Sequence, residues 1–214
     1  MFIFQGHAEV FNKDGESIKE FKAAIPGRFK DDNAVLDCIL NEKEKTFFIL
    51  DLVEWHGLNY MEYDTSFRLH WLKQKIEEDC PHVTKFSKDN IYKFIPLPFM
   101  KCDKESLTIL MTEPMPFTQK LDGILFYDMM SPYISGISSR VLWLEPFMLE
   151  EILDIKIPAH FNLKPKNYSD AKKYIEDYQK KEKIKRNFRK HHQRKIFSDK
   201  KKEKALKYGI TLNL

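Results

Sequence analysis

A series of strand-like runs joined by short turns constrains this fold more than any other feature of the chain. Residues 12–15, Asn-Lys-Asp-Gly, are a hairpin turn signal, because an Asp-Gly pair supplies the positive φ angles of a tight turn. Strand character resumes over residues 18–24. Two further apolar runs, residues 34–40 and 46–53, flank a polar turn at residues 41–45, which indicates a second hairpin. Strands joined by hairpins are antiparallel, so a mainly antiparallel sheet is predicted.

Helix signals lie between the strand-like runs. Ser66 is predicted to cap a helix over residues 67–78, on which Phe67, Trp71 and Leu72 share one face. Asp103 is predicted to cap a second helix over residues 104–111. Further strands are predicted over residues 2–11, 92–97, 123–127 and 141–144, and a short helix over residues 146–153. This mixture predicts an α+β domain.

Charge is distributed unevenly along the chain. Residues 180–207 contain fourteen Lys or Arg against three acidic residues, whereas the formal net charge of the whole chain is only +4. The core pattern ends near Lys164, so we predict a domain over residues 1–163 and a basic, largely solvated tail over residues 164–214. Residues 183–195 have the composition of a nuclear-localisation or RNA-backbone patch, with a solvated tail as the alternative.

Several protein classes do not fit this sequence. Cys38, Cys80 and Cys102 are widely spaced and form no CxxC motif, and the pair His191-His192 lacks partner ligands. A disulfide framework, a metal site and a cofactor are therefore not expected, and reduced thiols are typical of a cytosolic or nuclear protein. No stretch approaches the roughly 18 apolar residues of a membrane span, and the first residues lack the features of a signal peptide.

An ordered series of short motifs resembles the cap-binding domain of the snurportin family. Its first block comprises LDCILNE at residues 36–42, FILD at 48–51, WHG at 55–57, DTSFR at 64–68 and Trp71. Its second block comprises Pro116-Phe117, LDGILFY at residues 121–127, Tyr133, Gly136 and WLEP at 143–146. Each motif alone is a weak signal, but their order is specific, and the resemblance spans about residues 5–158.

The same blocks are similar, more distantly, to mRNA guanylyltransferases and ATP-dependent ligases, whose acidic-Gly-apolar strand matches Asp122-Gly123-Ile124. This implies a nucleotidyltransferase-like fold of the capping-enzyme and DNA-ligase type, in which two antiparallel sheets enclose a nucleotide cleft. Those enzymes use a lysine nucleophile in a Lys-x-Asp-Gly pattern, but here Lys13 directly precedes Asp14. Leucines also flank Trp143 where the enzymes place lysines. A cap-binding protein that is not an enzyme is therefore expected. A degenerate guanylyltransferase-like enzyme and an interaction domain without a ligand are the alternatives.

Trp143 is the first candidate for a binding residue, because the resemblance implies that it stacks on the base of the cap. A guanine methylated on its imidazole ring is cationic, and an indole face attracts it by stacking and cation–π interaction. A doubly methylated exocyclic amine has no N–H left, so aromatic surface gains more than the edge of a carboxylate would. The alternative is a core tryptophan on a buried strand, which is what we expect of Trp55 and Trp71.

Lys13, in the first hairpin turn, is the second candidate. The resemblance implies that it contacts the triphosphate bridge of the cap, where a lysine acts as a point charge against dense negative charge. A solvated turn lysine is the alternative. Asp51 and Asp122 match acidic positions that serve metal or sugar contacts in the enzymes, and here we expect structural roles for both.

The resemblance also implies partners and location. A snurportin-like protein is a nuclear import adaptor that binds the trimethylguanosine cap of U snRNAs and their snRNPs, and it shuttles between nucleus and cytoplasm. Importin-β would bind through a segment not present in this chain, an exportin would return the protein, and no membrane is involved. The family's first strands carry a serine, a second tryptophan and an arginine of the cap pocket. They would lie before Met1, so we expect these N-terminal strands to be missing from the sequence.

Overall fold

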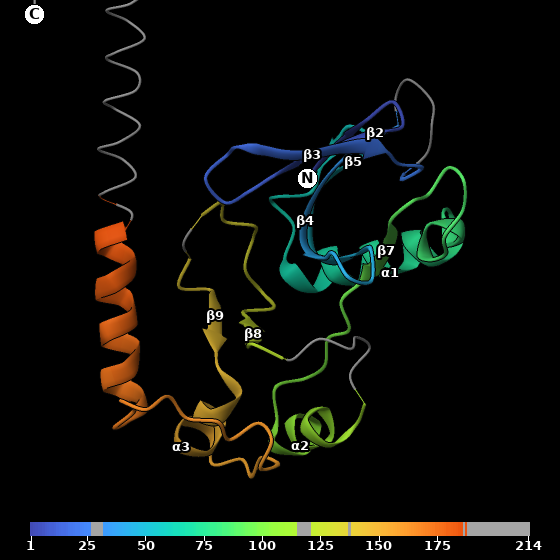
Figure 1. Cartoon of the computed structure of the whole chain (residues 1–214). Coiled ribbons are helices and arrows are strands. Elements are labelled where there is room, and N and C mark those ends of the chain that lie inside the picture. The colour runs from blue at the N-terminus through green and yellow to red at the C-terminus, as the bar shows by residue number, and fades with distance from the viewer. Residues whose placement is uncertain (27–31, 115–120, 137, 186, 188–214) are drawn as a thin grey trace, which may run out of the picture. The chain divides into compact units, whose positions relative to one another are not determined.

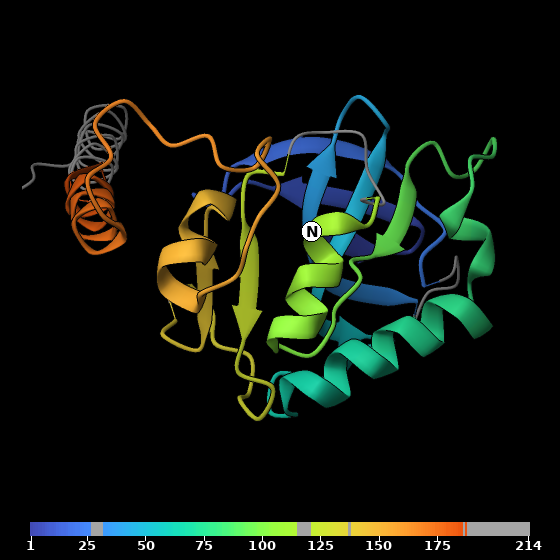
Figure 2. The same ribbon diagram turned by 90° about the horizontal axis from the view of Figure 1, so that it is seen from below.

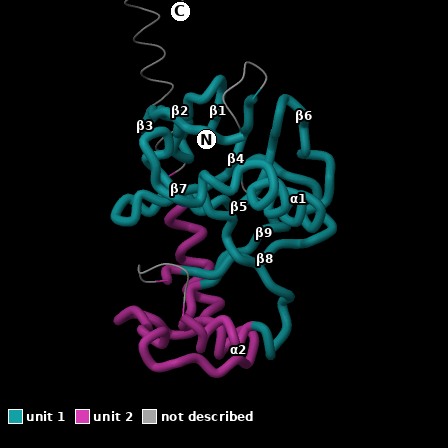
Figure 3. The backbone as a smooth tube through the Cα atoms, turned by 90° about the vertical axis from the view of Figure 1, so that its right-hand side faces the viewer, with its two compact units in different colours: residues 1–106, 123–144 teal, residues 107–122, 145–214 magenta. Residues whose placement is uncertain are grey.

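The computed structural model describes residues 1–26, 32–114, 121–136, 138–185 and 187. The chain divides into two compact units (Figure 3): residues 1–106 and 123–144 form unit 1, and residues 107–122 and 145–214 form unit 2. No helix among the described residues is long and apolar enough to cross a membrane. The predicted boundary between residues 163 and 164 stays a prediction.

A curled seven-stranded sheet is the main element of unit 1 within the described residues (Figures 1 and 2). Its strands are β1 (Phe2–Phe4), β2 (His7–Phe11), β3 (Ser17–Lys22), β4 (Asn33–Asn41), β5 (Thr46–Trp55), β6 (Leu58–Asn59) and β7 (Lys93–Pro96). They lie in the order β3-β2-β1-β4-β5-β6, and β7 pairs with β5. The β5–β7 pair is parallel, unlike the others. The antiparallel prediction is thus confirmed only in part, since the chain forms a helix between β5 and β7 and re-enters the sheet in the same direction.

One turn was missed in the sequence. The prediction of a single strand over residues 2–11 is wrong, because a two-residue turn at Gln5-Gly6 separates β1 from β2. Both residues have positive φ angles, 50° and 78°, as a two-residue hairpin requires. Gln-Gly lacks the Asn or Asp that marks such turns in a sequence, and this explains the error.

The predicted hairpins are confirmed at the two other turns. β2 and β3 are joined through residues 12–16, where Gly15 has a φ of 81°. The side-chain oxygen of Asn12 accepts hydrogen bonds from the backbone N–H groups of Asp14, at 2.9 Å, and Glu16, at 3.0 Å. This local closure fixes the turn without a second positive φ. The predicted hairpin between β4 and β5 is likewise antiparallel.

Helix α1 (Thr65–Glu78) begins two residues before the predicted start. Its N-cap is Asp64 and not Ser66, since an Asp64 oxygen accepts a hydrogen bond from the Phe67 N–H at 2.7 Å. Phe67 was expected on the buried face but is 41% exposed, whereas Arg68 is buried at 1%. The helix is rotated relative to our prediction because Arg68 enters an interior ion pair, described below.

The core of unit 1 combines aliphatic and aromatic side chains from the sheet and α1. Leu72 and Ile76 of α1 lie in the same buried cluster as Leu52 and Trp55 of β5. The rings of Trp55 and Trp71 meet edge to face at 5.8 Å. Trp55 is 1% exposed and Trp71 is partly buried against the cluster, which confirms both as core residues.

The remaining elements are helices and two further strands. The helices are η1 (Pro81–Thr84), α2 (Lys104–Thr112), η2 (Pro146–Met148), α3 (Leu149–Leu153) and a helical stretch over residues 171–185. The predicted cap of α2 is confirmed, since the Ser106 N–H donates to an Asp103 oxygen at 2.9 Å. The two strands predicted at residues 123–127 and 141–144 are also confirmed, as β8 (Ile124–Tyr127) and β9 (Val141–Leu144). They form a separate two-stranded antiparallel sheet in unit 1, here called the β8–β9 ribbon.

Candidate functional site

The β8–β9 ribbon presents Trp143 at the surface of unit 1. Trp143 pairs with Leu125, and Val141 pairs with Tyr127, so these four side chains share one face of the ribbon. Trp143 is 39% exposed, whereas Trp55 in the core is 1% exposed. An indole with this exposure retains a ring surface that a ligand can cover. The structure therefore does not place Trp143 in the core.

Gly123 provides the space in which the Trp143 indole lies. A Cβ atom added to Gly123 would lie 2.7 Å from Cδ1 of Trp143, and closer still to Nε1 and Cε2. Real Cβ atoms do not approach other atoms so closely, so any larger residue at this position must displace the ring. The glycine of the Asp-Gly motif therefore has a steric role, because only the absence of a side chain leaves room for the Trp143 indole.

A buried ion pair lies between the sheet and α1. Arg68 is 1% exposed and Asp51 is 4% exposed. Two parallel hydrogen bonds join them: Nε to Oδ1 and Nη2 to Oδ2, both at 2.8 Å. Arg68 also donates to the Thr65 hydroxyl at 3.1 Å and to the Ser131 carbonyl at 3.3 Å. These contacts satisfy both buried charges, as a buried ion pair requires.

The same region binds the segment that follows β8. The first turn of α1 donates two backbone hydrogen bonds to this segment: Thr65 N–H to the Ser131 carbonyl at 2.9 Å, and Ser66 N–H to the Met129 carbonyl at 3.0 Å. The Thr65 hydroxyl donates to the same Ser131 carbonyl at 3.1 Å. Free N–H groups at the start of a helix need acceptors, and here the chain after β8 supplies them.

Two tyrosines complete this polar region. The Tyr133 hydroxyl donates to an Asp37 oxygen on β4 at 2.6 Å. Burial raises the pKa of Tyr127 to about 12, and the carboxylates of Asp51 and Asp37 add to the effect. Burial and the hydrogen bond to Asp37 also raise the pKa of Tyr133. Both phenols are therefore neutral at physiological pH, and the Tyr133 proton remains available to Asp37.

Lys13 lies at the exposed tip of the turn between β2 and β3, which Figure 1 shows at the left of unit 1. Its side chain makes no hydrogen bond, ion pair or ring contact with the residues that the structure describes. The lysine cation is thus accessible to an anionic ligand. Lys13 and Trp143 both belong to unit 1, and a ligand that uses both must extend from one to the other.

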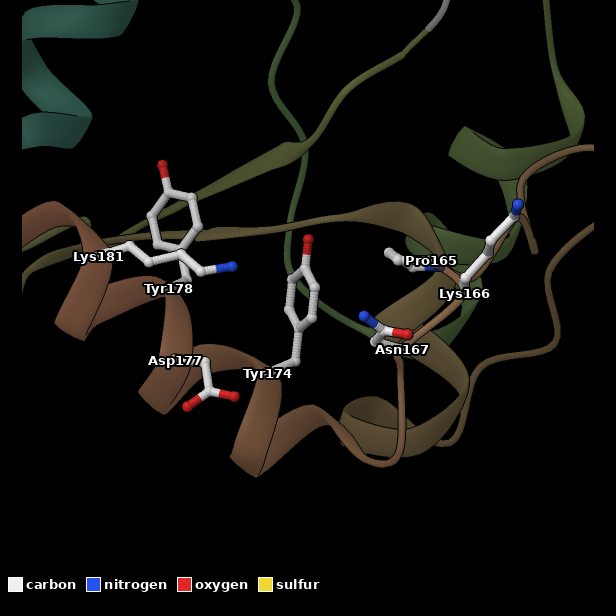
Figure 4. A pocket seen from close by; sticks show the side chains of 7 residues that line it. All are labelled: Pro165, Lys166, Asn167, Tyr174, Asp177, Tyr178 and Lys181. Carbon is white, nitrogen blue, oxygen red and sulfur yellow. The ribbon is translucent and has the colours of Figure 1, made fainter.

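The other candidate residues have different surroundings. Asp51 is buried and paired, in agreement with a structural role, while Asp122 is exposed. His191-His192 and most of the basic patch lie outside the described residues. Where the chain is described, no three His, Cys, Asp or Glu side chains gather as a metal site. Unit 2 carries a pocket of about 400 Å³ (Figure 4), lined by Pro165, Lys166, Asn167, Tyr174, Asp177, Tyr178 and Lys181.

Three residues of this region were not identified from the sequence: Gly123, Arg68 and Tyr133. All three lie within the motif series, but none was given a role of its own. Arg68 left one signal, because it is a charged residue only one position from the predicted apolar face of α1. A fully buried Arg is almost always paired, so an Arg that lies at the edge of a buried helix face is a candidate for an interior ion pair.

A comparison with protein families agrees with the motif series. The model of the Snurportin1 m3G cap-binding domain family matches residues 1–146, which is more than half of the chain. The matched span begins before the turn that carries Lys13 and ends just beyond β9, which carries Trp143. The resemblance inferred from the ordered motifs is thereby confirmed.

Proposed function

The chain belongs to the Snurportin1 m3G cap-binding domain family, and on this premise we propose that it binds trimethylguanosine-capped U snRNA as a nuclear import adaptor. The observation that carries the proposal is the exposed indole of Trp143, seated against Gly123 on the β8–β9 ribbon. A trimethylated guanine is cationic and presents a flat ring, and an indole face binds such a ring by stacking and cation–π attraction.

The proposed cleft is of the nucleotidyltransferase type. The two sheets of unit 1, the curled seven-stranded sheet and the β8–β9 ribbon, support this proposal. The cap base would stack on Trp143, and the triphosphate bridge would extend towards the turn that carries Lys13. Ring stacking would supply most of the affinity for the base, and the Lys13 cation would stabilise the phosphates by charge.

The proposed function is that of a binding protein and not of an enzyme. Lys13 directly precedes Asp14, which differs from the Lys-x-Asp-Gly spacing of a nucleotidyltransferase nucleophile. Incubation with radiolabelled GTP and Mg²⁺ tests this point, because nucleotidyl transfer leaves a covalent lysine–GMP adduct. We expect no adduct. A labelled band that is lost in Lys13→Ala would support the degenerate-enzyme alternative.

The adaptor role extends the proposal to macromolecular partners. The cargo would be U snRNPs, and the carriers would be importin-β and an exportin, with shuttling between nucleus and cytoplasm. Capture of capped RNA by the immobilised protein tests the cargo. We expect a trimethyl-capped transcript to be retained over the same transcript with a 5′ triphosphate. Equal retention of both would contradict cap recognition.

Lys13→Ala is expected to weaken cap binding less than loss of the indole does. It removes one phosphate contact, so the affinity of the variant should fall less steeply with salt concentration than that of the wild type. The measurement is a cap titration at several salt concentrations. Lys43→Ala, in the turn between β4 and β5, is the matched control because Lys43 is also an exposed turn lysine. A Lys13 variant with the salt dependence of this control would contradict the phosphate role.

Gly123→Ala is expected to weaken cap binding by an amount close to that of losing the stacking contact, about 1–3 kcal/mol. The added methyl group would occupy the position of the indole and force Trp143 out of its orientation. Gly136→Ala is the matched control, because it adds a methyl group in open space and adds only the strain of a positive φ angle. The measurement is a cap titration of both variants, with melting temperatures measured in parallel. Equal affinities of Gly123→Ala and Gly136→Ala for the cap would contradict the steric role.

A further inference from the structure

We propose that Arg68 and Tyr133 are positioning residues of the cap site, which fix the β8–β9 ribbon and with it the orientation of the Trp143 indole. One segment connects these two residues to the ribbon: residues 128–133 follow β8, contact α1 and the sheet, and lead back towards β9. This inference rests on the proposed function for its link to cap binding. The anchoring itself can be tested without any ligand.

The ribbon needs support from outside its own strands. Within the described residues, β8 pairs only with β9. A two-stranded ribbon is marginally stable in water by itself. Burial of its side chains is incomplete, since those of β8 are half-buried and Val141, Leu142 and Trp143 of β9 are 36%, 58% and 39% exposed. Contacts of the connecting segment add to what fixes its direction.

The first anchor is the Ser131 carbonyl. Three groups donate to this one oxygen: Thr65 N–H at 2.9 Å, the Thr65 hydroxyl at 3.1 Å and Arg68 Nη1 at 3.3 Å. Arg68 is itself held by its bidentate pair with Asp51 on β5. The chain four residues after β8 is thus tied to both α1 and the sheet.

Tyr133 provides the second anchor, two residues further on. Its hydroxyl donates to Asp37 on β4 at 2.6 Å, and its backbone N–H donates to the Met61 carbonyl at 2.8 Å. The Arg68 guanidinium lies 5.8 Å from the centre of the Tyr133 ring. The two anchors therefore contact each other and hold the segment at adjacent points of the sheet.

A third contact transmits this fixation to the ribbon. Asp128, directly after β8, pairs with Arg140, directly before β9: Arg140 Nη1 lies 2.8 Å from Asp128 Oδ2, and the Asp128 N–H donates to the Arg140 carbonyl at 2.8 Å. Trp143 follows three residues later. Since base stacking depends on ring orientation, a loosened ribbon should bind the cap less tightly even when the fold is intact.

Tyr133→Phe tests the inference, because it removes the hydroxyl and keeps the ring. We expect about a three- to tenfold loss of cap affinity, measured far below the melting temperature. Tyr92→Phe is the matched control. It also removes a partly buried tyrosine hydroxyl, which accepts a hydrogen bond from Lys19 Nζ at 2.7 Å, but this hydroxyl lies away from the ribbon. In a Trp143→Ala background, Tyr133→Phe should have little further effect on binding, because the positioned group is gone.

Hydrogen exchange gives the ligand-free readout. The backbone amides that pair across the ribbon, such as those of Phe126 and Leu142, should exchange faster in Tyr133→Phe but not in Tyr92→Phe. Unchanged exchange in the ribbon would overturn the inference. So would a loss of affinity that persists undiminished in the Trp143→Ala background. If the exchange rates respond but the wild type does not bind the cap, the proposed function fails and the anchoring stands.

Discussion

Trp143→Ala is expected to weaken binding of a trimethylguanosine cap by about 1–3 kcal/mol, roughly 5- to 150-fold, and to leave the fold intact. The loss follows from removal of the stacking surface. The fold should persist because the side chain is 39% exposed and lies on the ribbon, outside the main core cluster. The loss should also depend on methylation of the base, since the cation–π part of the contact requires the cationic ring.

Leu142→Ala is the matched control for this variant. Leu142 is the neighbouring residue on β9, is 58% exposed and points to the opposite face of the ribbon. Both variants remove an exposed apolar side chain from the same strand, but only Trp143→Ala should reduce affinity in a titration followed by calorimetry. Equal affinities for the two variants would show that Trp143 is not the stacking residue.

Arg68→Ala is expected to produce the largest loss of stability, about 3–5 kcal/mol. The substitution leaves the Asp51 carboxylate buried without its partner and removes a donor from the Ser131 carbonyl. Urea denaturation of the wild type and of Arg68→Ala gives the difference in their free energies of unfolding. Lys73→Ala is the control, because Lys73 lies on the exposed face of α1 in a loose pair with Glu77, 3.9 Å apart.

The control should change stability by only about 0–0.5 kcal/mol, as is usual for an exposed pair within a helix. Because a loss of 5 kcal/mol can leave too little folded protein to measure, Arg68→Lys serves as a second variant. It keeps the charge but cannot form both parallel hydrogen bonds, so a smaller loss is expected. If neither Arg68 variant differed from Lys73→Ala, the ion pair would have no structural role.

Local signals accounted for much of the fold. The hairpin of β4 and β5, the Asp103 cap and both strands of the ribbon follow from patterns within a few residues, and all were predicted. The Gln5-Gly6 turn was missed because its composition lacks the usual turn residues. The parallel pairing of β7 with β5 joins segments over forty residues apart, and no local pattern encodes such a pairing.

The site depends still more on distant contacts. Residues 141–144 form an apolar run, which by itself predicts a buried strand, so the exposure of Trp143 was not evident from composition. The ring instead lies against Gly123, and Asp51 meets Arg68 across the interior. Only the motif series directed attention to Trp143. It could not reveal what holds the indole in place, because those contacts exist only once the chain is folded.

One measurement tests the central claim most directly: titration of the wild-type chain with a trimethylguanosine cap analogue and with unmethylated GpppG under the same conditions. The two ligands share the phosphate bridge, so contacts such as that of Lys13 cancel, and the difference reports on the base. Cation–π attraction of about 0.5–2 kcal/mol predicts about two- to thirtyfold tighter binding of the trimethyl cap. Equal affinity for the two ligands, or tighter binding of GpppG, would contradict cap recognition by this chain.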